Sequence, residues 1–389
     1  MMIFPKIRLK KGKEQSLRRF HRWVFSGAIE ELPTEVHPGD WVEVYSRDDR
    51  YLATGYYQDS NIAVRIVSFV QTEINLDFWK AKIASALDVR EKLGFTKSDS
   101  TNCFRLVNAE GDELPGLVID WYNGTAVLQS HSDGVRKNIQ CIADAVAQVL
   151  GDSVKAIFHK PSFPYNEDPG DYLYGAPDVT TILENGLIFH INLERGQKTG
   201  YFLDQRENRR LLRKVSSGAK VLDAFCYAGG FSANALKGGA TWVDAVDIAP
   251  VAGELTRKNL EINDFEGKFN FIQMDVLKYI QGTAEQYDVM VLDPPAYAKH
   301  LSSRHNAVQG YKRLNAEALG KIKSGGYLFT FSCSQVVDKK LFENTIMAAA
   351  IEAGRMARVI YRLGQPADHP VNIFHPESEY LKGLVLQVE

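Results

Sequence analysis

Four aspartates stand at the ends of predicted strands, and together they suggest a ligand site. They are Asp223, Asp247, Asp275 and Asp293. The stretch around the first, Val221–Ser232, turns through two glycines, which predicts a buried strand, a tight loop open to a ligand and a helix start. Such a set of carboxylates repels a pyrophosphate and attracts a cation. The pattern therefore predicts a ligand with a nucleoside end and a positive charge, for which a sulfonium is suited.

Each of these carboxylates suits a particular part of such a ligand. An acidic residue that ends the second strand, as Asp247 does, can accept hydrogen bonds from ribose hydroxyls. Asp275 can accept one from an adenine amino group, and Asp223 can orient the loop or face an α-ammonium group. The alternative is that each aspartate only caps the helix that follows it. The loop matches neither the dinucleotide fingerprint nor the phosphate-binding loop.

The elements that must position these aspartates alternate regularly from about residue 186. Strands are expected at Val221–Phe225, Val243–Asp247, Phe269–Met274, Val289–Asp293 and Tyr327–Ser332. Helices such as Gly253–Asn263 and Ala307–Lys321 separate them, which predicts a doubly wound, mainly parallel sheet with the site at the carboxyl ends of its strands. The last two runs, Ala357–Leu363 and Gly383–Val388, are expected to form a hairpin at the sheet edge.

The first half of the chain has a different pattern. Alternating runs at Trp41–Tyr45, Leu52–Tyr57 and Ile62–Val67 predict a small barrel-like β domain that ends near residue 70. Helices over Phe78–Leu93 and Gly134–Leu150, with strands between them, predict an α+β region. Residues 160–180 are interpreted as a linker or surface loop because they hold four prolines: Pro161, Pro164, Pro169 and Pro177.

The composition narrows the class of protein. With 389 residues, two or three domains are expected, and a net charge of −2 gives no whole-molecule attraction to nucleic acid. The four cysteines form no Cys-x-x-Cys pair and no zinc-like cluster with histidine, so no metal is expected. Few cysteines, no signal-peptide segment and no apolar run of membrane-spanning length indicate a cytoplasmic protein without membrane contact.

The second half resembles the class I S-adenosylmethionine-dependent methyltransferases. Asp223–Gly230 is similar to their glycine motif, Asp247 to their ribose carboxylate, and Asp293-Pro-Pro-Ala-Tyr297 to their catalytic motif. Two further blocks, Gly196–Arg209 and Phe331–Ser334, resemble the ribosomal RNA large-subunit 5-methylcytosine methyltransferase family. That resemblance covers the whole chain in layout, with motifs that are specific in the second half and weak in the first 180 residues.

The resemblance implies an α/β architecture in three parts. Residues 1–70 would be a small barrel-like PUA domain that binds RNA, residues 71–185 a central α+β domain with the proline-rich linker, and residues 186–389 a Rossmann-like methyltransferase domain with a seven-stranded, mainly parallel sheet. The cofactor would be S-adenosylmethionine. Its expected contacts are Asp223, Phe225, Tyr227, Gly229, Asp247, Asp275, Asp293, Lys198, Thr199, Tyr201, Asp204 and Gln205. For the segment 197–209, a solvated charged helix start is the alternative.

Cys333 and Asp293 are the expected catalytic residues. Carbon 5 of a pyrimidine is a poor nucleophile, but a thiolate that adds to carbon 6 makes it enamine-like and able to take a methyl group. Cys333 follows the fifth strand, and Asp293 would hydrogen-bond or protonate N3 while Pro294, Pro295 and Tyr297 face the flat base. The alternatives are a buried structural thiol and a simple proline turn.

The sequence also departs from that family's pattern. Many RNA 5-methylcytosine enzymes carry a second cysteine directly after the proline of this motif, for product release, whereas Ala296 stands there in this chain. The residue that removes the C5 proton is therefore unidentified. Cys226, in the glycine loop, is expected to pack rather than to react.

The N-terminus offers a nucleic-acid contact. Residues 1–25 hold eight Lys and Arg with aromatic side chains between them, which suits phosphate contact and base stacking. The expected RNA contacts there are Lys10, Lys11, Arg18, Arg19 and Arg22. A solvated charged face is the alternative. The target base would have to leave its stack to reach Cys333.

These observations lead to one hypothesis and two rivals. The chain is expected to form 5-methylcytosine in large-subunit (23S) ribosomal RNA through a covalent Cys333 adduct. One rival is an amino-group methyltransferase on RNA or protein that uses the Asp293–Tyr297 turn and needs no cysteine. The other is a non-catalytic RNA-binding factor in ribosome assembly. The partner is expected to be RNA, and a homodimer is left open.

Overall fold

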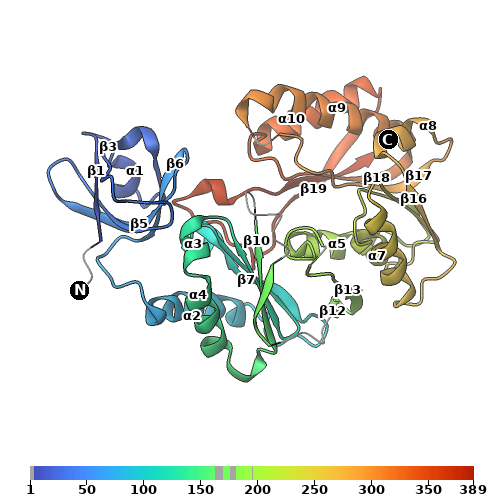
Figure 1. Cartoon of the computed structure of the whole chain (residues 1–389). Helices are drawn as coiled ribbons and strands as arrows, with labels where there is room; N and C mark the ends of the chain where they lie inside the picture. The colour runs from blue at the N-terminus through green and yellow to red at the C-terminus, as the bar shows by residue number, and fades with distance from the viewer. Residues whose placement is uncertain (1–3, 163–169, 176–180, 195, 299) are drawn as a thin grey trace. The chain divides into compact units, whose positions relative to one another are not determined.

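The computed structural model describes residues 4–162, 170–175, 181–194, 196–298 and 300–389 (Figure 1). The chain divides into two compact units. The first unit comprises Met1–Ile182, Ile191–Leu203 and Ala367–Ser378, and the second comprises Leu183–His190, Asp204–Pro366 and Glu379–Glu389. Among the described residues, no helix has both the length and the apolar character needed to cross a membrane.

The first unit begins with a six-stranded sheet in the order β2-β6-β5-β4-β1-β3. Its strands are β1 (Lys6–Leu9), β2 (Trp23–Phe25), β3 (Ile29–Glu31), β4 (Trp41–Tyr45), β5 (Tyr51–Tyr57) and β6 (Ile62–Ser68), with the short helix α1 (Gln15–Arg18). Alternate residues such as Ile7, Val42 and Ile66 are fully buried and form one core, as the period-two pattern predicts. The three predicted runs are all strands.

A five-stranded sheet with two long helices follows in the first unit, in the order β11-β10-β9-β8-β7. Its elements are α2 (Leu76–Lys92), β7 (Cys103–Asn108), β8 (Leu117–Tyr122), β9 (Thr125–Ser130), α3 (Asp133–Lys137), α4 (Ile139–Leu150), β10 (Ala156–Pro161) and β11 (Asp171–Tyr174). Apolar residues of α2 and α4, such as Trp79 and Ile142, share one core with the strands.

Two expectations for this region need correction. The single helix predicted over Gly134–Leu150 is broken at Asn138, whose side chain donates to Gly134 O at 2.8 Å and ends α3. Part of the predicted linker is sheet, because β10 runs to Pro161 and pairs with β11. Pro164, Pro169 and Pro177 lie outside the described residues.

A short two-stranded sheet, β12 (Thr181–Glu184) and β13 (Leu187–His190), precedes the main sheet of the second unit. That main sheet has seven strands: β14 (Lys220–Ala224), β15 (Trp242–Asp247), β16 (Phe269–Gln273), β17 (Tyr287–Leu292), β18 (Ile322–Ser332), β19 (Ala357–Gly364) and β20 (Lys382–Val388). Their order is β16-β15-β14-β17-β18-β20-β19. The helices are α5 (Arg206–Leu212), α6 (Gly230–Lys237), α7 (Pro250–Glu261), α8 (Val276–Gly282), α9 (Arg304–Lys321) and α10 (Lys339–Glu352).

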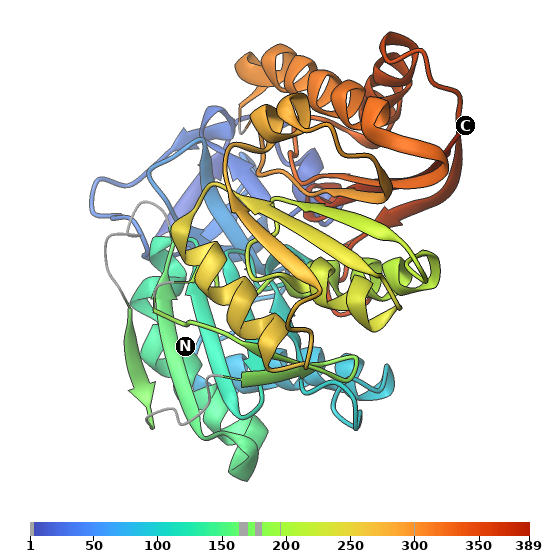
Figure 2. The ribbon, with the colours of Figure 1, turned by 90° about the vertical axis from the view of Figure 1, so that its right-hand side faces the viewer.

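The first five strands of this sheet are parallel, and β20 is antiparallel to both neighbours, β18 and β19. Helices α9 and α10 lie over one face and α5 and α7 over the other (Figures 1 and 2). The predicted doubly wound, seven-stranded, mainly parallel sheet with a hairpin at its edge is therefore confirmed. Parallel pairing brings the carboxyl ends of β14 to β18 to one edge.

Candidate active site

The predicted aspartates and Cys333 stand at the carboxyl-end edge of the second unit's sheet. Asp223 is the fourth of five residues in β14, and Asp247 is the last residue of β15. Asp293 and Cys333 directly follow β17 and β18, which pair with each other through Leu292 and Thr330. The remaining aspartate, Asp275, comes two residues after β16. The topology thus gathers residues that are 110 positions apart in the sequence, Asp223 to Cys333.

The glycine loop after β14 has an unusual backbone that its neighbours hold in place. Phe225, Tyr227 and Gly229 have φ values of 64°, 48° and 71°, in the left-handed region. A Cβ on Gly229 would approach Thr256 Cγ2 to 3.0 Å, so the loop packs tightly on α7. Thr256 Oγ1 donates to Tyr227 O at 3.1 Å. The loop is therefore a preformed backbone cradle at the start of α6.

Asp223 lies beneath this loop. Its side chain is 1% exposed, and its Oδ2 accepts from the amide of Ser232 at 2.9 Å and from the Ser232 hydroxyl at 2.6 Å. Burial raises the pKa of Asp223 to about 7. The two hydrogen bonds from Ser232 lower this pKa, but their effect is smaller than that of burial. Asp223 is predicted either to orient the loop or to face an α-ammonium group, and its contacts with Ser232 support the first of these roles.

Asp247 and Asp275 are more accessible. The two oxygens of Asp247 accept from the backbone amides of Tyr227, at 3.1 Å, and Ala249, at 2.9 Å, which fixes the carboxylate at the strand end. Each oxygen keeps a further lone pair for a ribose hydroxyl. Asp275 is exposed and caps α8 by accepting from Lys278 N at 2.9 Å. Helix capping, the alternative weighed for each aspartate, is observed for Asp275.

The other predicted cofactor segment is divided between the two units. In the first unit, Thr199 Oγ1 donates to Asp120 at 2.6 Å and Tyr201 O accepts from the Tyr122 hydroxyl at 3.2 Å. Exposed Lys198 has its ammonium 4.6 Å from the centre of the Phe202 ring.

In the second unit, Asp204 accepts from the Tyr380 hydroxyl at 2.8 Å, and Gln205 accepts from Asn208 at 2.6 Å. These contacts give Thr199, Asp204 and Gln205 clear structural roles. Their contact with the cofactor stays a prediction.

The Asp293 turn is stiff and one of its faces is packed on helix α9. Pro294 is buried and Pro295 is exposed, and Asp293 is half-buried between strand and turn. The ring of Tyr297 packs against that of Tyr311, with centroids 4.6 Å apart and the ring planes tilted by 33°. Base stacking by Tyr297 therefore stays a prediction, since at least one partner of this ring is internal.

Cys333 is half-buried and lies close to the Asp293 turn. Ser334, its neighbour, donates from Oγ to Ala298 O at 2.6 Å, so the segments after Cys333 and after Tyr297 are hydrogen-bonded to each other. Below them lies the hydroxyl of Tyr311, whose pKa burial raises to about 12. Cys333 and Asp293 contribute to the raised pKa after burial, so both groups lie near this one hydroxyl.

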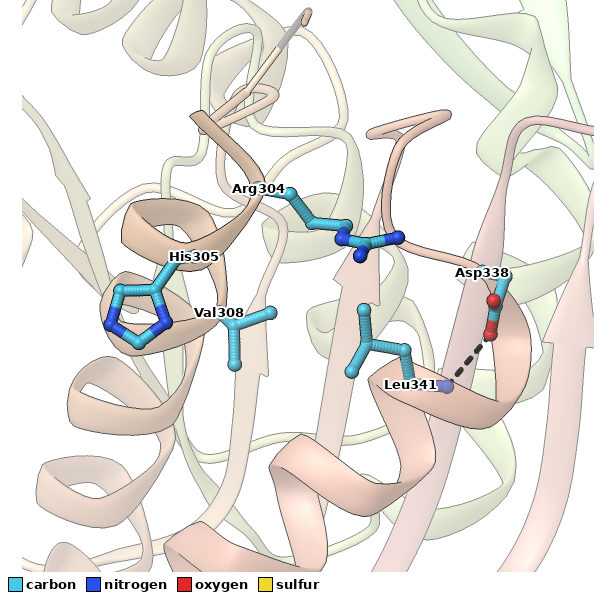
Figure 3. A pocket seen from close by; sticks show the side chains of 5 residues that line it. All are labelled: Arg304, His305, Val308, Asp338 and Leu341. Atoms are coloured by element: carbon cyan, nitrogen blue, oxygen red, sulfur yellow. Dashed lines mark hydrogen bonds between the residues drawn. The ribbon is translucent and has the colours of Figure 1, made fainter. Parts of the chain in front are cut away.

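A pocket of about 430 Å³ lies between the starts of helices α9 and α10. It is lined by Arg304, His305 and Val308 of α9 and by Asp338 and Leu341 at the start of α10 (Figure 3). Figure 3 shows Arg304 extending from α9 toward the turn that carries Asp338. Helices α9 and α10 begin shortly after the Asp293 turn and Cys333, respectively, so this pocket belongs to the same edge of the sheet.

The remaining cysteines have different surroundings. Cys226 is buried, its Sγ lies 3.6 Å from Thr256 Oγ1, and burial raises its thiol pKa well above the usual value. Cys103 is buried in β7, and Cys141 is half-buried in α4, where burial again raises the pKa. The expectation that Cys226 packs agrees with these contacts.

The basic N-terminal residues divide into exposed and buried ones. Lys10, Lys11, Arg18 and Arg19 are exposed. Arg22 differs from its prediction as an RNA contact, because it is 4% exposed, donates to Ile66 O at 3.2 Å and pairs with Glu113 at 3.1 Å. Its guanidinium holds the first unit together instead.

The structure adds Tyr311, which sequence reasoning missed, and gives surroundings to other groups whose roles the sequence left open. Lys382, at the start of β20, is 5% exposed and lies beside the Cys333 segment, and Tyr311 lies below it. In the first unit, His21 Nε2 faces both carboxylate oxygens of Glu377 at 3.3 Å. The ring of buried His375 packs against His21, with centroids 4.5 Å apart and planes tilted by 38°. The sequence signal for Lys382 was a lysine directly before an apolar strand, which is a rare place for a charge.

Comparisons with known proteins match both halves of the chain to families. A PUA-like domain family matches residues 7–69, and an S-adenosylmethionine-dependent methyltransferase family matches residues 110–379. Ribosomal RNA large subunit methyltransferase I of Alteromonas mediterranea is 36% identical over 98% of this chain and 98% of its own length. The protein of the same name from Aeromonas salmonicida is 36% identical over the full length of both chains.

Solved structures show the same fold. A candidate SAM-dependent methyltransferase from Streptococcus mutans has a TM-score of 0.86 at 25% identity, covering 99% of this chain and 100% of that one. A second candidate methyltransferase, solved in complex with SAH, has the same TM-score at 24% identity. The carboxylates and the glycine cradle suit the cationic, nucleoside-bearing cofactor S-adenosylmethionine, as the sequence predicts. The chain, with its PUA-like domain, therefore belongs to the S-adenosylmethionine-dependent methyltransferases, in the family of the proteins named ribosomal RNA large subunit methyltransferase I.

Proposed function

We propose that this protein methylates carbon 5 of a cytosine in large-subunit ribosomal RNA, with Cys333 as nucleophile. The relatives' names support the RNA class. The observation that carries the chemistry is the half-exposed thiol of Cys333 beside Asp293, at the ends of two adjacent strands on the cofactor edge. An amino-group transfer would use the Asp293 turn alone and would need no thiol there.

Binding of the cofactor rests on the glycine cradle and on Asp247. The backbone from Phe225 to Gly229 would hold the amino-acid end, and Asp247 would accept from the ribose hydroxyls. Exposed Asp275 would accept from the adenine amino group. S-adenosylmethionine supplies an electrophilic methyl group at this edge.

The residues of this chain would then carry the substrate chemistry. The Cys333 thiolate adds to C6 of the cytosine, and the electron pair of the C5–C6 double bond moves toward the N3 side of the ring. Asp293 hydrogen-bonds or protonates N3 and so holds that charge. C5 then takes the methyl group, a base removes the C5 proton, and the returning electron pair breaks the bond between C6 and sulfur.

RNA binding would use the exposed cations of the first unit and the pocket at the sheet edge. Lys10, Lys11, Arg18 and Arg19 offer phosphate contacts in the part of the chain that matches a PUA-like domain. Arg304 and His305, at the start of α9 on the same edge of the sheet as Cys333, offer donors for the backbone of the target strand. We propose that a base flipped out of its stack enters at this edge.

A trapping experiment tests the proposal. Ribosomal RNA fragments containing 5-fluorocytidine would be incubated with the protein and S-adenosylmethionine, because fluorine at C5 cannot leave as a proton and the C6 adduct is retained. We expect a covalent protein–RNA species in denaturing gels, with the cross-link on Cys333 by peptide mass spectrometry. Cys226→Ala should still form it and Cys333→Ala should not.

Two outcomes would replace the proposal. Methyl transfer by Cys333→Ala at the wild-type rate, with the label on an exocyclic nitrogen, would establish amino-group methylation at the Asp293 turn. No transfer to any undermodified large-subunit RNA, with tight RNA binding retained, would establish the non-catalytic assembly factor.

A further inference from the structure

Lys382 is a charged residue buried against the Cys333 segment. In the antiparallel pair of β18 and β20 it stands directly opposite Ser332, the residue before Cys333. Its ammonium donates to the carbonyl of Ser334, the residue after Cys333, at 2.7 Å. The side chain is 5% exposed. The backbone of Lys382 therefore pairs with the residue before the proposed nucleophile, and its ammonium binds the residue after it.

Such a cation needs a negative partner, because an unpaired buried charge is costly. Burial lowers the pKa of Lys382 to about 8, and Cys333 is the neighbour that raises it most, ahead of Asp338 and Glu379, while Lys339 lowers it. Those two carboxylates have other contacts. Asp338 accepts from Leu341 N at 2.8 Å, and Glu379 pairs with Lys339 at 2.5 Å.

We propose that Lys382 is a positioning residue that keeps Cys333 in its thiolate form, so that the nucleophile is ready before RNA binds. The inference rests on the proposed function, in which Cys333 attacks C6. The attraction between an ammonium and a thiolate favours the charged form of both groups. It therefore raises the pKa of Lys382 and lowers the pKa of Cys333. Lys382 acts on the substrate only through the thiol.

Two other titratable groups lie near Cys333, the carboxyl of Asp293 and the hydroxyl of Tyr311. The negative charge of Asp293 opposes a neighbouring thiolate and so increases the need for a cation at this site. The hydroxyl of Tyr311 is buried, and its pKa of about 12 keeps it neutral near pH 7. It can donate a hydrogen bond but supplies no charge. Of Lys382, Asp293 and Tyr311, Lys382 is therefore the one that carries a positive charge.

The test is the reactivity of the Cys333 thiol in the full-length protein without RNA. Iodoacetamide alkylation would be followed from pH 5 to pH 10, with Cys333 read out by peptide mass spectrometry. We expect a wild-type thiol pKa below the ordinary value of about 8.5. In Lys382→Met we expect a pKa above the wild-type value by about one unit or more, and alkylation at pH 7 slower by about ten-fold.

Three controls make the outcome decisive. Lys382→Arg keeps the charge and should retain most of the low thiol pKa. Lys340→Met makes the same change at an exposed site on α10 and should match the wild type. Circular dichroism and thermal unfolding would establish that Lys382→Met is folded.

An ordinary wild-type thiol pKa, at or above about 8.5, would overturn the inference without any variant. The same pKa in the wild type and in folded Lys382→Met would do so as well. The proposed function fails separately, because it depends on the RNA adduct and on methyl transfer, whereas thiol alkylation needs neither RNA nor cofactor.

Discussion

Cys226 and Cys333 both follow strands of the same mainly parallel sheet, yet they differ in burial and in the charges nearby, which control the reactivity of a thiol. Cys226 follows β14, is buried against Thr256, and has a pKa raised by burial and by the charges of Asp223 and Asp247. Cys333 follows β18, is half-exposed, and has the ammonium of Lys382 held beside its backbone. The region around β14 and β15 gathers carboxylates that suit a cationic cofactor. The region around β17 and β18 combines a carboxylate, a thiol and a buried cation, which suits nucleophilic chemistry.

The two cysteine variants should give the largest difference. Cys333→Ala is expected to lower methyl transfer by about 10⁴-fold or more, because the addition to C6 is lost. Cys226→Ala should lose less than about ten-fold, through looser packing of the glycine loop. Single-turnover transfer of labelled methyl to undermodified RNA measures both, and similar losses in the two variants would remove the distinction between the two regions.

The pH dependence of stability tests the carboxylate side. Because folding raises the pKa of Asp223 from 3.8 to about 7, the folded protein binds more protons than the unfolded chain between these values. This group therefore disfavours folding increasingly as pH rises from about 4 to about 7, by at most about 4 kcal/mol. In urea unfolding at pH 5 and pH 8, Asp223→Asn should lose less stability on going to pH 8 than the wild type loses. Equal pH slopes would contradict a raised pKa.

Cofactor affinity tests the role of Asp247 in the same region. Asp247→Ala should weaken binding of S-adenosylhomocysteine by about 10–100-fold, since it removes a charged acceptor for the ribose and frees the amides of Tyr227 and Ala249. Calorimetric titration measures the affinity, with Glu266→Ala as a control at an exposed position. Unchanged affinity in Asp247→Ala would mean that the ribose is held elsewhere.

The smallest effect concerns the glycine cradle. Gly229→Ala should destabilise the fold by about 1–2 kcal/mol, because φ is 71° and the new Cβ would lie 3.0 Å from Thr256. In α9, Gly320→Ala meets no heavy atom within 4 Å and should stabilise by about 0.5–1 kcal/mol. Thermal unfolding of both variants measures the contrast, and a stabilised Gly229→Ala would show that the loop can relax.

The sequence predicts the sheet well and the side-chain environments poorly. The strands from Val221 onward alternate with helices in a local pattern, so the parallel sheet and its carboxyl-end edge follow from it. Whether Asp223 faces a ligand or Ser232, and whether Arg22 is exposed or paired with Glu113, depends on residues far away in the chain. No local pattern carries that information.

The same reason explains why the sequence does not place Lys382 beside Cys333. Its place depends on the register of β20 against β18, which joins residues 50 positions apart, Ser332 and Lys382. The break in the helix at Asn138 is a smaller case. There is no glycine or proline at that point, and a side-chain hydrogen bond to Gly134 ends the first segment.

The position of β20 between β18 and β19 has a consequence for biosynthesis. Both flanking strands leave the ribosome before β20 does, so the edge of β18 stays unpaired until the later strand inserts beside it. A nascent chain that stops short of β20 would expose that edge to other chains and would also lack Lys382. If the low pKa of the Cys333 thiol depends on Lys382, the sheet is completed and the nucleophile is activated in the same step. A polypeptide that ends before β20 would then carry an unreactive Cys333.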